Sequence, residues 1–406
     1  MTYFSFLFSR LTPNFCHNIR SNRLQEYIVT PIICFGEEPI EGSKHQLEIL
    51  MNTIEQLDVS GSHREVGLNI GLHFAGAIHR LFDNYDFLQK QLLPFLNTTA
   101  GQRFFQSYLK LHRKYFPQYI AELEGLAEGS GRPFEEIFGV NLRGEFAGLI
   151  ALARPTDGTI AADVQGCTDC LVLTPDAALI GHNEDGSPAG YGNMYVVRVA
   201  VDDCPTFTVL SYPGFLPGNA FGFNEFGILH SINHVAPRPI KVGLSRHFIA
   251  RALLDARTLD DAIRVITMPD RASGFNYNIG SLSERQVVSV EVSPEGHHVQ
   301  AVQGYYTHTN HYLELKKQKQ EITLSSRKRL ERSLTLCRST PPNDVGHVLA
   351  LLGDQTDRDY PIYRDAKLPD DNATLCSALY DLDRRELRIY WGNPVREPEK
   401  CMQIAM

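Results

Sequence analysis

The pattern of apolar residues changes abruptly after Ala161, and this change limits the folds open to the chain. Before it, apolar residues recur at near-helical spacing, whereas short β-prone runs separated by Gly, Pro, Asn and Asp dominate after it. The expected helices span residues 62–82, 101–129, 133–153, 245–255, 259–266, 325–337 and 343–352. The expected strands include residues 171–173, 195–199, 207–210, 228–230, 276–281, 286–292, 298–302, 375–380 and 387–390.

This order of elements predicts a layered fold. Helices, a sheet, more helices and more strands are expected when two sheets stack and helices cover both outer faces. We therefore predict an α+β protein, a four-layer αββα sandwich in which two stacked antiparallel sheets are covered by helices. Three segments follow from the same pattern: a poorly patterned N-terminal segment (1–60), a helical region (61–166) and a region that carries most of the strands (167–406).

Composition excludes several classes of function. Of the 406 residues, 43% are hydrophobic and 21% charged, which is enough for a large core. The formal net charge is −8 with both signs interspersed, so we expect no nucleic-acid partner and interpret the basic run 316–332 as the solvated face of a helix. No stretch reaches the roughly 18 to 20 apolar residues of a membrane span. The first residues lack the features of a signal peptide, and the eight cysteines are irregularly spaced, so we expect a cytoplasmic protein with reduced thiols.

Cys167 is a candidate nucleophile because Gly166 precedes it and a predicted strand follows it. Gly166 leaves its carbonyl sterically open, so the thiol could attack its own peptide bond in an N→S acyl shift. Hydrolysis would then free an α-amino group with an ordinary pKa of about 7.7 to 8.0, which can take the thiol proton near neutral pH. Two alternatives remain for this cysteine. It could be a small buried apolar residue, or it could join Cys170 in a Cys-x-x-Cys redox or zinc motif, although no second such motif is present.

A series of motifs resembles one enzyme family. In chain order the motifs are residues 119–125, 141–146, 166–168 (Gly-Cys-Thr), 181–185 (Gly-His-Asn-Glu-Asp), 212–218, 222–227, 245–248, 307–311 and 391–394. The series resembles the acyl-coenzyme A:6-aminopenicillanic-acid (isopenicillin N) acyltransferase family, which consists of N-terminal-nucleophile hydrolases and includes the β-alanyl-dopamine and carcinine hydrolases. The resemblance covers roughly residues 60 to 400, and the ordered series is more specific than any single motif.

The resemblance implies cleavage before Cys167 into an α chain (1–166) and a β chain (167–406). Asp185 matches the carboxylate that orients the new ammonium, although by its position it could also cap backbone amides. Asn233 matches an amide of the oxyanion pocket, or it is a turn residue that ends a strand. Thr168, His297 and Asn310 are candidate substrate-binding residues. His297 stands where some relatives carry an arginine, so either it replaces that charge or the basic role belongs to another residue.

The resemblance also implies the reaction. We expect Cys167 to cleave a small N-acyl amine, such as a β-alanyl amine, through a thioester, with acyl-coenzyme A as a possible acyl donor. We expect no cofactor and no metal, and we interpret His308 and His311 as structural residues despite their His-x-x-His spacing. The alternatives are an uncleaved, non-catalytic binding scaffold and a redox or zinc protein that uses Cys167 and Cys170.

Overall fold

The computed structural model describes residues 54–153, 166–238 and 240–406. Residues 47–406 belong to one compact unit, so the predicted α and β chains share it from residue 47 onward. Most of the predicted N-terminal segment (1–60) lies outside the described residues. Its last part does not, because residues 55–61 form a strand that the sequence analysis did not predict.

A six-stranded sheet carries the candidate nucleophile. Its strands, in spatial order, are β12 (Gly304–His308), β2 (Cys167–Leu173), β3 (Ala178–Gly186), β14 (Ala373–Asp381), β15 (Glu386–Tyr390) and β16 (Cys401–Ala405). All neighbouring pairs are antiparallel, and a β-bulge interrupts the pairing of β14 with β3 between Thr374 and Cys376. Such bulges are common next to active sites because they redirect side chains.

An eight-stranded sheet faces the first. Its order is β1 (Glu55–Gly61), β4 (Tyr195–Val201), β5 (Phe207–Ser211), β6 (Phe221–Asn224), β7 (Ile228–His234), β9 (Phe275–Ser281), β10 (Gln286–Val292) and β11 (His297–Ala301). A short ribbon pairs β8 (Ala236–Pro237) with β13 (Gln320–Glu321). The predicted antiparallel pairing is wrong at one edge, since β1 runs parallel to β4. A parallel neighbour requires a long connection, and here the helices that follow β1 and the strands β2 and β3 lie between the two.

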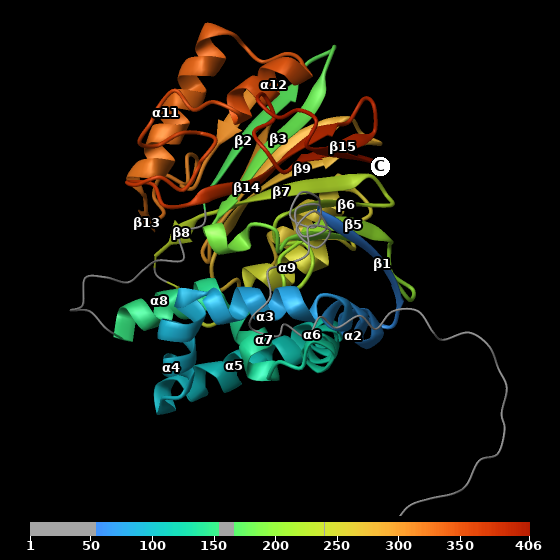
Figure 1. The fold of residues 1–406 in the computed structure, drawn as a ribbon, viewed down its shortest axis with the longest axis vertical. Helices are drawn as coiled ribbons and strands as arrows, with labels where there is room; N and C mark the ends of the chain where they lie inside the picture. The colour runs from blue at the N-terminus through green and yellow to red at the C-terminus, as the bar shows by residue number, and fades with distance from the viewer. Residues whose placement is uncertain (1–53, 154–165, 239) are drawn as a thin grey trace, which may run out of the picture. The chain divides into compact units, whose positions relative to one another are not determined.

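Helices cover both outer faces of the sheets (Figure 1). The helices α11 (Leu324–Ser339) and α12 (Val345–Leu352) lie on the six-stranded sheet. On the opposite side lie α9 (Arg246–Leu253) and α10 (Leu259–Ile266), with the group α2 (His63–His73), α3 (Ala75–Asn84), α4 (Leu93–Leu96), α5 (Thr99–Tyr115), α6 (Pro117–Ser130), α7 (Phe134–Val140) and α8 (Arg143–Ala153). Two short turns complete the described elements, a π-helix (Leu88–Leu92) and a 3₁₀ turn (Pro188–Gly190). The predicted αββα sandwich is confirmed.

Three predicted helices are each divided in two. The stretch 62–82 breaks at Phe74, which caps α2 and begins α3. The stretch 101–129 breaks before Pro117, because a proline lacks the N–H of a helix interior but fits the first helical position. The third, 133–153, is interrupted between α7 and α8.

The two faces of β2 differ in their surroundings. Cys170 and Val172 pack in a cluster with Cys337, Val348 and Leu351 of the covering helices. Side chains alternate along a strand, so Cys167 and Asp169 project from the other face. That face looks toward the eight-stranded sheet, because Asp169 accepts hydrogen bonds from Ser231 and Asn233 of β7.

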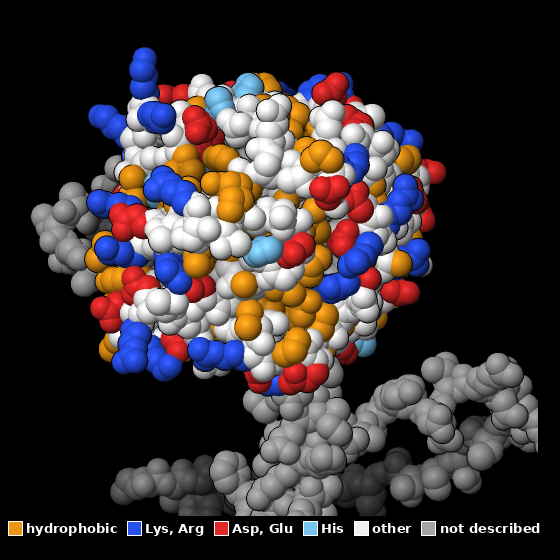
Figure 2. Space-filling view, turned by 90° about the horizontal axis from the view of Figure 1, so that it is seen from above, with side chains coloured by type: hydrophobic (Ala, Val, Ile, Leu, Met, Phe, Trp, Pro, Cys, Tyr) orange, Lys and Arg blue, Asp and Glu red, His pale blue; other side chains and the backbone are white. Residues whose placement is uncertain are grey.

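The surface carries mixed charge. Basic and acidic side chains are interspersed on the face shown in Figure 2. No helix among the described residues is long and apolar enough to cross a membrane.

Candidate active site

Hydrogen bonds fix the peptide bond between Gly166 and Cys167 on both sides. The Gly166 carbonyl accepts a hydrogen bond of 3.0 Å from the backbone N–H of Asp185. On the other side, the N–H of Cys167 donates to Oδ1 of Asn310 over 3.0 Å. The carbonyl of Cys167 accepts from Nη1 of Arg329 at 2.5 Å. With Cys167 only 3% exposed, the bond lies in a buried setting with defined donors and an acceptor.

Glycine is required at position 166 by its neighbours. A Cβ atom at this position would lie 2.2 Å from Nη1 of Arg364 and 3.0 Å from Nη2 of Arg329. Both guanidinium groups are buried, so they have little room to move away. Steric constraints in the folded chain therefore explain why a glycine precedes Cys167.

Together with Asp370, which pairs with Arg364, Asp185 balances the charge of these two arginines. Its Oδ2 lies 3.6 Å from Nη1 of Arg364 and 4.0 Å from Nη1 of Arg329, while Thr374 donates its hydroxyl to Oδ1 at 2.7 Å. Burial raises the pKa of Asp185 to about 6, against the opposing effect of Arg364 and Arg329. The carboxylate is therefore ionised at neutral pH, and its described partners are side chains rather than the backbone amides of the alternative interpretation.

A second buried chain of polar groups runs beside the thiol. His182 donates from Nδ1 to Asp169 at 3.0 Å and from Nε2 to Glu184 at 2.9 Å. Ser231 donates to Asp169 at 2.5 Å, and the hydroxyl of Tyr212 donates to Glu184. Burial opposes protonation of His182, but Asp169 and then Glu184 raise its pKa to about 10. His182 is therefore an imidazolium between two carboxylates.

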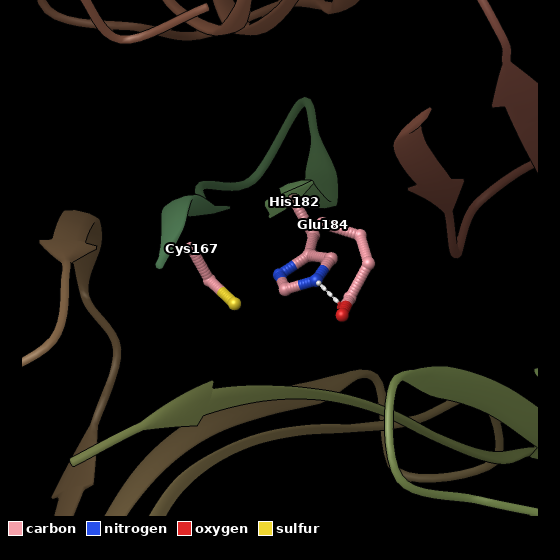
Figure 3. Close-up of side chains that lie close together, drawn as sticks. All are labelled: Cys167, His182 and Glu184. Atoms are coloured by element: carbon pink, nitrogen blue, oxygen red, sulfur yellow. Dashed lines mark hydrogen bonds and ion pairs between the residues drawn. The ribbon is translucent and has the colours of Figure 1, made fainter. Parts of the chain in front are cut away.

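These carboxylates also determine the state of the thiol. Burial, followed by Glu184, Asp185 and Asp169, raises the pKa of Cys167 well above its ordinary value. The thiol is thus protonated at neutral pH in the uncleaved chain. Figure 3 shows Cys167, His182 and Glu184 projecting from neighbouring strands into the same space.

A cavity lies near this cluster. Cys167 is opposite Glu184 in the β2–β3 register, and Glu184 is opposite Cys376 in the β3–β14 register. Residues directly opposite one another project from the same face, so the three side chains form a row across the sheet. Cys376 lines a cavity of about 140 Å³. The other lining residues are Ile54, Gly190, Tyr191, Gly192, Met194, Leu375 and Trp391.

Comparison with known proteins identifies the family. The model of the family described as acyl-coenzyme A:6-aminopenicillanic acid acyl-transferase matches residues 172–396, more than half of the chain. The chain belongs to this family. It is therefore an amidohydrolase or acyltransferase, as the motif series implied.

Two curated relatives are similar in sequence. A β-alanyl-dopamine/carcinine hydrolase of Drosophila melanogaster is 27% identical over 367 residues, which is 84% of this chain and 93% of the relative. The 40 kDa form of an acyl-coenzyme A:6-aminopenicillanic-acid acyltransferase of Emericella nidulans is 27% identical over 205 residues, 50% of this chain and 54% of the relative.

Solved structures resemble the chain more distantly. A mutant form of the conjugated bile acid hydrolase of Clostridium perfringens aligns with a TM-score of 0.40 and 10% identity, over 59% of this chain and 92% of that one. Penicillin V acylase of Agrobacterium tumefaciens aligns with a TM-score of 0.38 and 12% identity, over 56% and 83%.

The family residues predicted from sequence lie around Cys167 with one exception. Asp185 and Asn310 contact the peptide bond or its arginines as described above. Asn233 is buried in β7, where it donates to Asp169, so its role in an oxyanion pocket stays a prediction. The hydroxyl of Thr168 accepts from Nη1 of Arg329 at 2.9 Å. His297 is exposed at the start of the edge strand β11, and among the described residues it has no contact with this cluster.

The paired use of Cys167 and Cys170 is wrong. The two residues are three positions apart on β2, so their side chains point to opposite faces of the sheet. Cys170 packs in the cluster with Cys337 on the helix side. No redox pair or shared zinc site can form from these two thiols without breaking the strand. His308 and His311 also have separate partners, since His308 donates from Nδ1 to Asn233 at 3.1 Å and His311 contacts the Ser326 hydroxyl at 2.7 Å.

Several residues of the site were not predicted from the sequence. Arg329 lies in the basic run interpreted as a solvated helix face, but it is only 1% exposed and contacts Cys167, so that interpretation is wrong for this residue. Arg364 carried no sequence signal at all. Asp169, His182 and Glu184 could have been found, because Asp169 is two residues after Cys167 and His182 two before Glu184. That spacing places each pair on one face of a strand.

Proposed function

We propose that this family member is a self-cleaving cysteine amidohydrolase or acyltransferase with Cys167 as its nucleophile. The sulfur attacks the carbonyl carbon of Gly166, the C–N bond breaks, and the nitrogen of Cys167 takes the thiol proton. Water then hydrolyses the thioester, which leaves a carboxylate on Gly166 and a free amine and thiol on Cys167. The products are residues 1–166 and 167–406.

The main support for this proposal is the set of hydrogen bonds and charges around the 166–167 peptide bond. The N–H of Asp185 donates to the Gly166 carbonyl, so it can stabilise the oxyanion that forms there when sulfur attacks. Asn310 accepts from the nitrogen that leaves, and so it fixes the position of the new amine. Arg329 and Arg364 flank Gly166 and favour the negative charge that the carbonyl oxygen develops.

Cleavage also explains how the thiol is activated. In the uncleaved chain burial and three carboxylates keep the pKa of the thiol high. A free α-amino group on the same residue supplies a base and, once protonated, a positive charge beside the sulfur. Asn310 already accepts from the nitrogen of this group, and we propose that the charge of Asp185, which acts on the same residue, helps to orient it. Nucleophile and base then share Cys167.

The substrate we propose is a small N-acyl amine of the β-alanyl-amine type. The insect relative, aligned over most of both chains, is named for two such substrates. The cavity next to Cys376 supports a small substrate as well, because a volume of about 140 Å³ is close to one that holds a single aromatic ring. Acyl transfer from acyl-coenzyme A is the second candidate, supported by the fungal relative.

Trapping of the thioester tests this proposal. The purified protein is mixed with a panel of N-acyl amines, including β-alanyl amines, and quenched in acid, and the masses of its fragments are measured. We expect the 167–406 fragment to gain one acyl group, and the gain to be absent in Cys167→Ala. Cys204→Ser, which removes a thiol in another part of the molecule, should behave like the unmodified protein. An amine released at the full rate by Cys167→Ala would contradict the proposal.

A further inference from the structure

Three donor atoms of different chemistry converge beside the nucleophile. The Cys167 sulfur, a ring nitrogen of His182 and a carboxylate oxygen of Glu184 all lie within 4.8 Å of one another, and all three residues are buried. They come from the adjacent strands β2 and β3, on the face that looks into the space between the sheets (Figure 3). No flexible loop is needed to assemble them.

This donor set suits zinc. Thiolate, imidazole and carboxylate are the ligands of Zn²⁺ in proteins, and three of them with an open fourth position are typical of a reactive zinc site. Ligand atoms around tetrahedral zinc are about 3.3–3.7 Å apart, from bond lengths of about 2.0–2.3 Å. The sulfur, within 4.8 Å of the other two donors, would therefore approach by up to about 1.5 Å, while His182 Nε2 and the Glu184 carboxylate, now 2.9 Å apart, would separate slightly. Side-chain rotation allows movements of this size.

The surrounding groups already hold these donors in a ligand orientation. A histidine that binds zinc usually donates its other ring N–H to a carboxylate, and His182 donates from Nδ1 to Asp169 at 3.0 Å. This leaves Nε2 on the side of Glu184, the hydrogen bond that a metal would replace. Glu184 is itself held by the Tyr212 hydroxyl. Two of the three ligands thus have the outer partners that zinc sites show.

The charge of the site is compatible with a divalent ion that displaces two protons. The three carboxylates Asp169, Glu184 and Asp185 act on the Cys167 sulfur, but Arg329, Arg364 and the imidazolium of His182 offset them. A divalent ion would pair with the thiolate and with Glu184, and the thiol and the imidazolium would each release one proton. In the mature chain the α-amine of Cys167 would be a fourth donor, because it closes a five-membered ring with its own sulfur.

We propose that Cys167, His182 and Glu184 bind one Zn²⁺ ion, which blocks the nucleophile reversibly. The binding requires only these three side chains, whereas the inhibition rests on the function proposed for Cys167. Zinc binding and turnover are therefore measured separately.

The test uses the full-length protein as purified, freed of metal with a chelator. Zn²⁺ is titrated by calorimetry, and Co²⁺ serves as a spectroscopic probe because a thiolate bound to it absorbs strongly in the near ultraviolet. We expect one ion per chain, a thiolate band with Co²⁺, and loss of amide hydrolysis in step with Zn²⁺ occupancy that the chelator reverses. Glu184→Gln should weaken binding by at least about tenfold, and Cys167→Ala should remove the thiolate band.

A matched control comes from another cysteine and histidine. The half-buried Cys204 lies between β4 and β5 of the eight-stranded sheet, and its sulfur is 4.0 Å from Nε2 of His63. Cys204→Ser should leave Zn²⁺ affinity and activity unchanged. If binding is lost in Cys204→Ser, or is unaffected in both Glu184→Gln and Cys167→Ala, the proposed site is wrong. If zinc binds but turnover is undiminished, the zinc site is correct and Cys167 is not the nucleophile. If turnover is normal but no zinc binds, Cys167 keeps its proposed role and the zinc site is wrong.

Discussion

Single charged residues around Cys167 affect the site through the groups that they contact. Arg329 joins three parts of the site, because it contacts the Cys167 carbonyl, the Thr168 hydroxyl and Oδ1 of Asn310. It comes from α11, 162 residues along the chain from Cys167. A change at such a residue should affect chemistry more than folding, provided that its bulk is kept.

Arg329→Met should reduce kcat/KM by about 100- to 1,000-fold, the usual effect of removing one charged donor from a reacting centre. Steady-state kinetics on the best N-acyl amine measure this. The control is Arg332→Ala on the same helix, which removes a part-exposed ion pair of 2.7 Å with Asp354 and should leave kcat/KM within about twofold. Equal effects of the two changes would contradict the role of Arg329.

The protonation of His182 affects the stability of the protein. Its pKa is raised to about 10 from an ordinary value of about 6.5, so its pairing stabilises the fold fully below about pH 6.5 and is lost as the pH rises through about 10. His182→Gln should therefore lower the free energy of unfolding by about 3–5 kcal/mol at pH 6 and by much less near pH 10. Urea unfolding at several pH values measures this difference.

A surface pair provides the comparison for His182. His73→Gln removes an exposed contact of 2.7 Å with Glu55, and it should cost less than about 1 kcal/mol. A cost of His182→Gln that stays constant or grows toward pH 10 would show that the imidazolium does not stabilise the site.

Glycine residues allow two helices of the protein to pack closely against each other. The helices α2 and α6 cross with backbones almost in contact, because a Cβ at Gly67 would lie 1.9 Å from the Glu122 carbonyl oxygen, and one at Gly125 would lie 2.1 Å from that of Arg64. Behind this crossing, Arg251 reaches the buried carboxylate of Glu122 at 3.3 Å. The close crossing thus connects α2 to the region after Cys167.

Gly67→Ala should destabilise the protein by about 1–3 kcal/mol, because the added methyl group forces the two helices apart. Gly76→Ala in α3 is the matched control. Its Cβ would meet only the Arg80 guanidinium, at 3.3 Å, so helix propensity should make it neutral or stabilising by up to about 1 kcal/mol. Urea unfolding distinguishes the two, and a neutral Gly67→Ala would mean that the crossing is looser than described.

Local patterns predicted the elements well and their partners poorly. The helix 259–266 and the strand 286–292 match α10 and β10 to the residue, because propensity and turn residues determine them locally. The break at Phe74 follows instead from packing, since its ring stacks on Tyr195 of a distant strand at 3.5 Å between centroids. Arg329 was misinterpreted for the same reason: its partners lie on elements far along the chain, and the local sequence of α11 is simply basic.

Across the whole of the unit from residue 47 onward, the two predicted chains are interleaved. The strand β1 adds to the edge of a sheet whose other strands all follow Cys167. Buried contacts reinforce this pairing, such as the hydrogen bonds of Asn141 to Gly214 at 3.0 Å and to Leu216 at 2.8 Å. Cleavage at 166–167 removes none of these contacts.

The two fragments should therefore remain together after cleavage. We expect them to elute as one species in size-exclusion chromatography, even in about 1 M salt, because buried pairs are screened little. They should separate only in denaturant. Two peaks under native conditions would contradict the interleaved architecture.

The most direct test of the account is the mass and N-terminal sequence of the purified chain. Two fragments, 1–166 and 167–406, are predicted, and the larger should begin Cys-Thr-Asp-Cys. Cys167→Ala should give a single inactive chain. Fully active protein whose backbone is continuous from Gln165 to Thr168 would contradict the central claim.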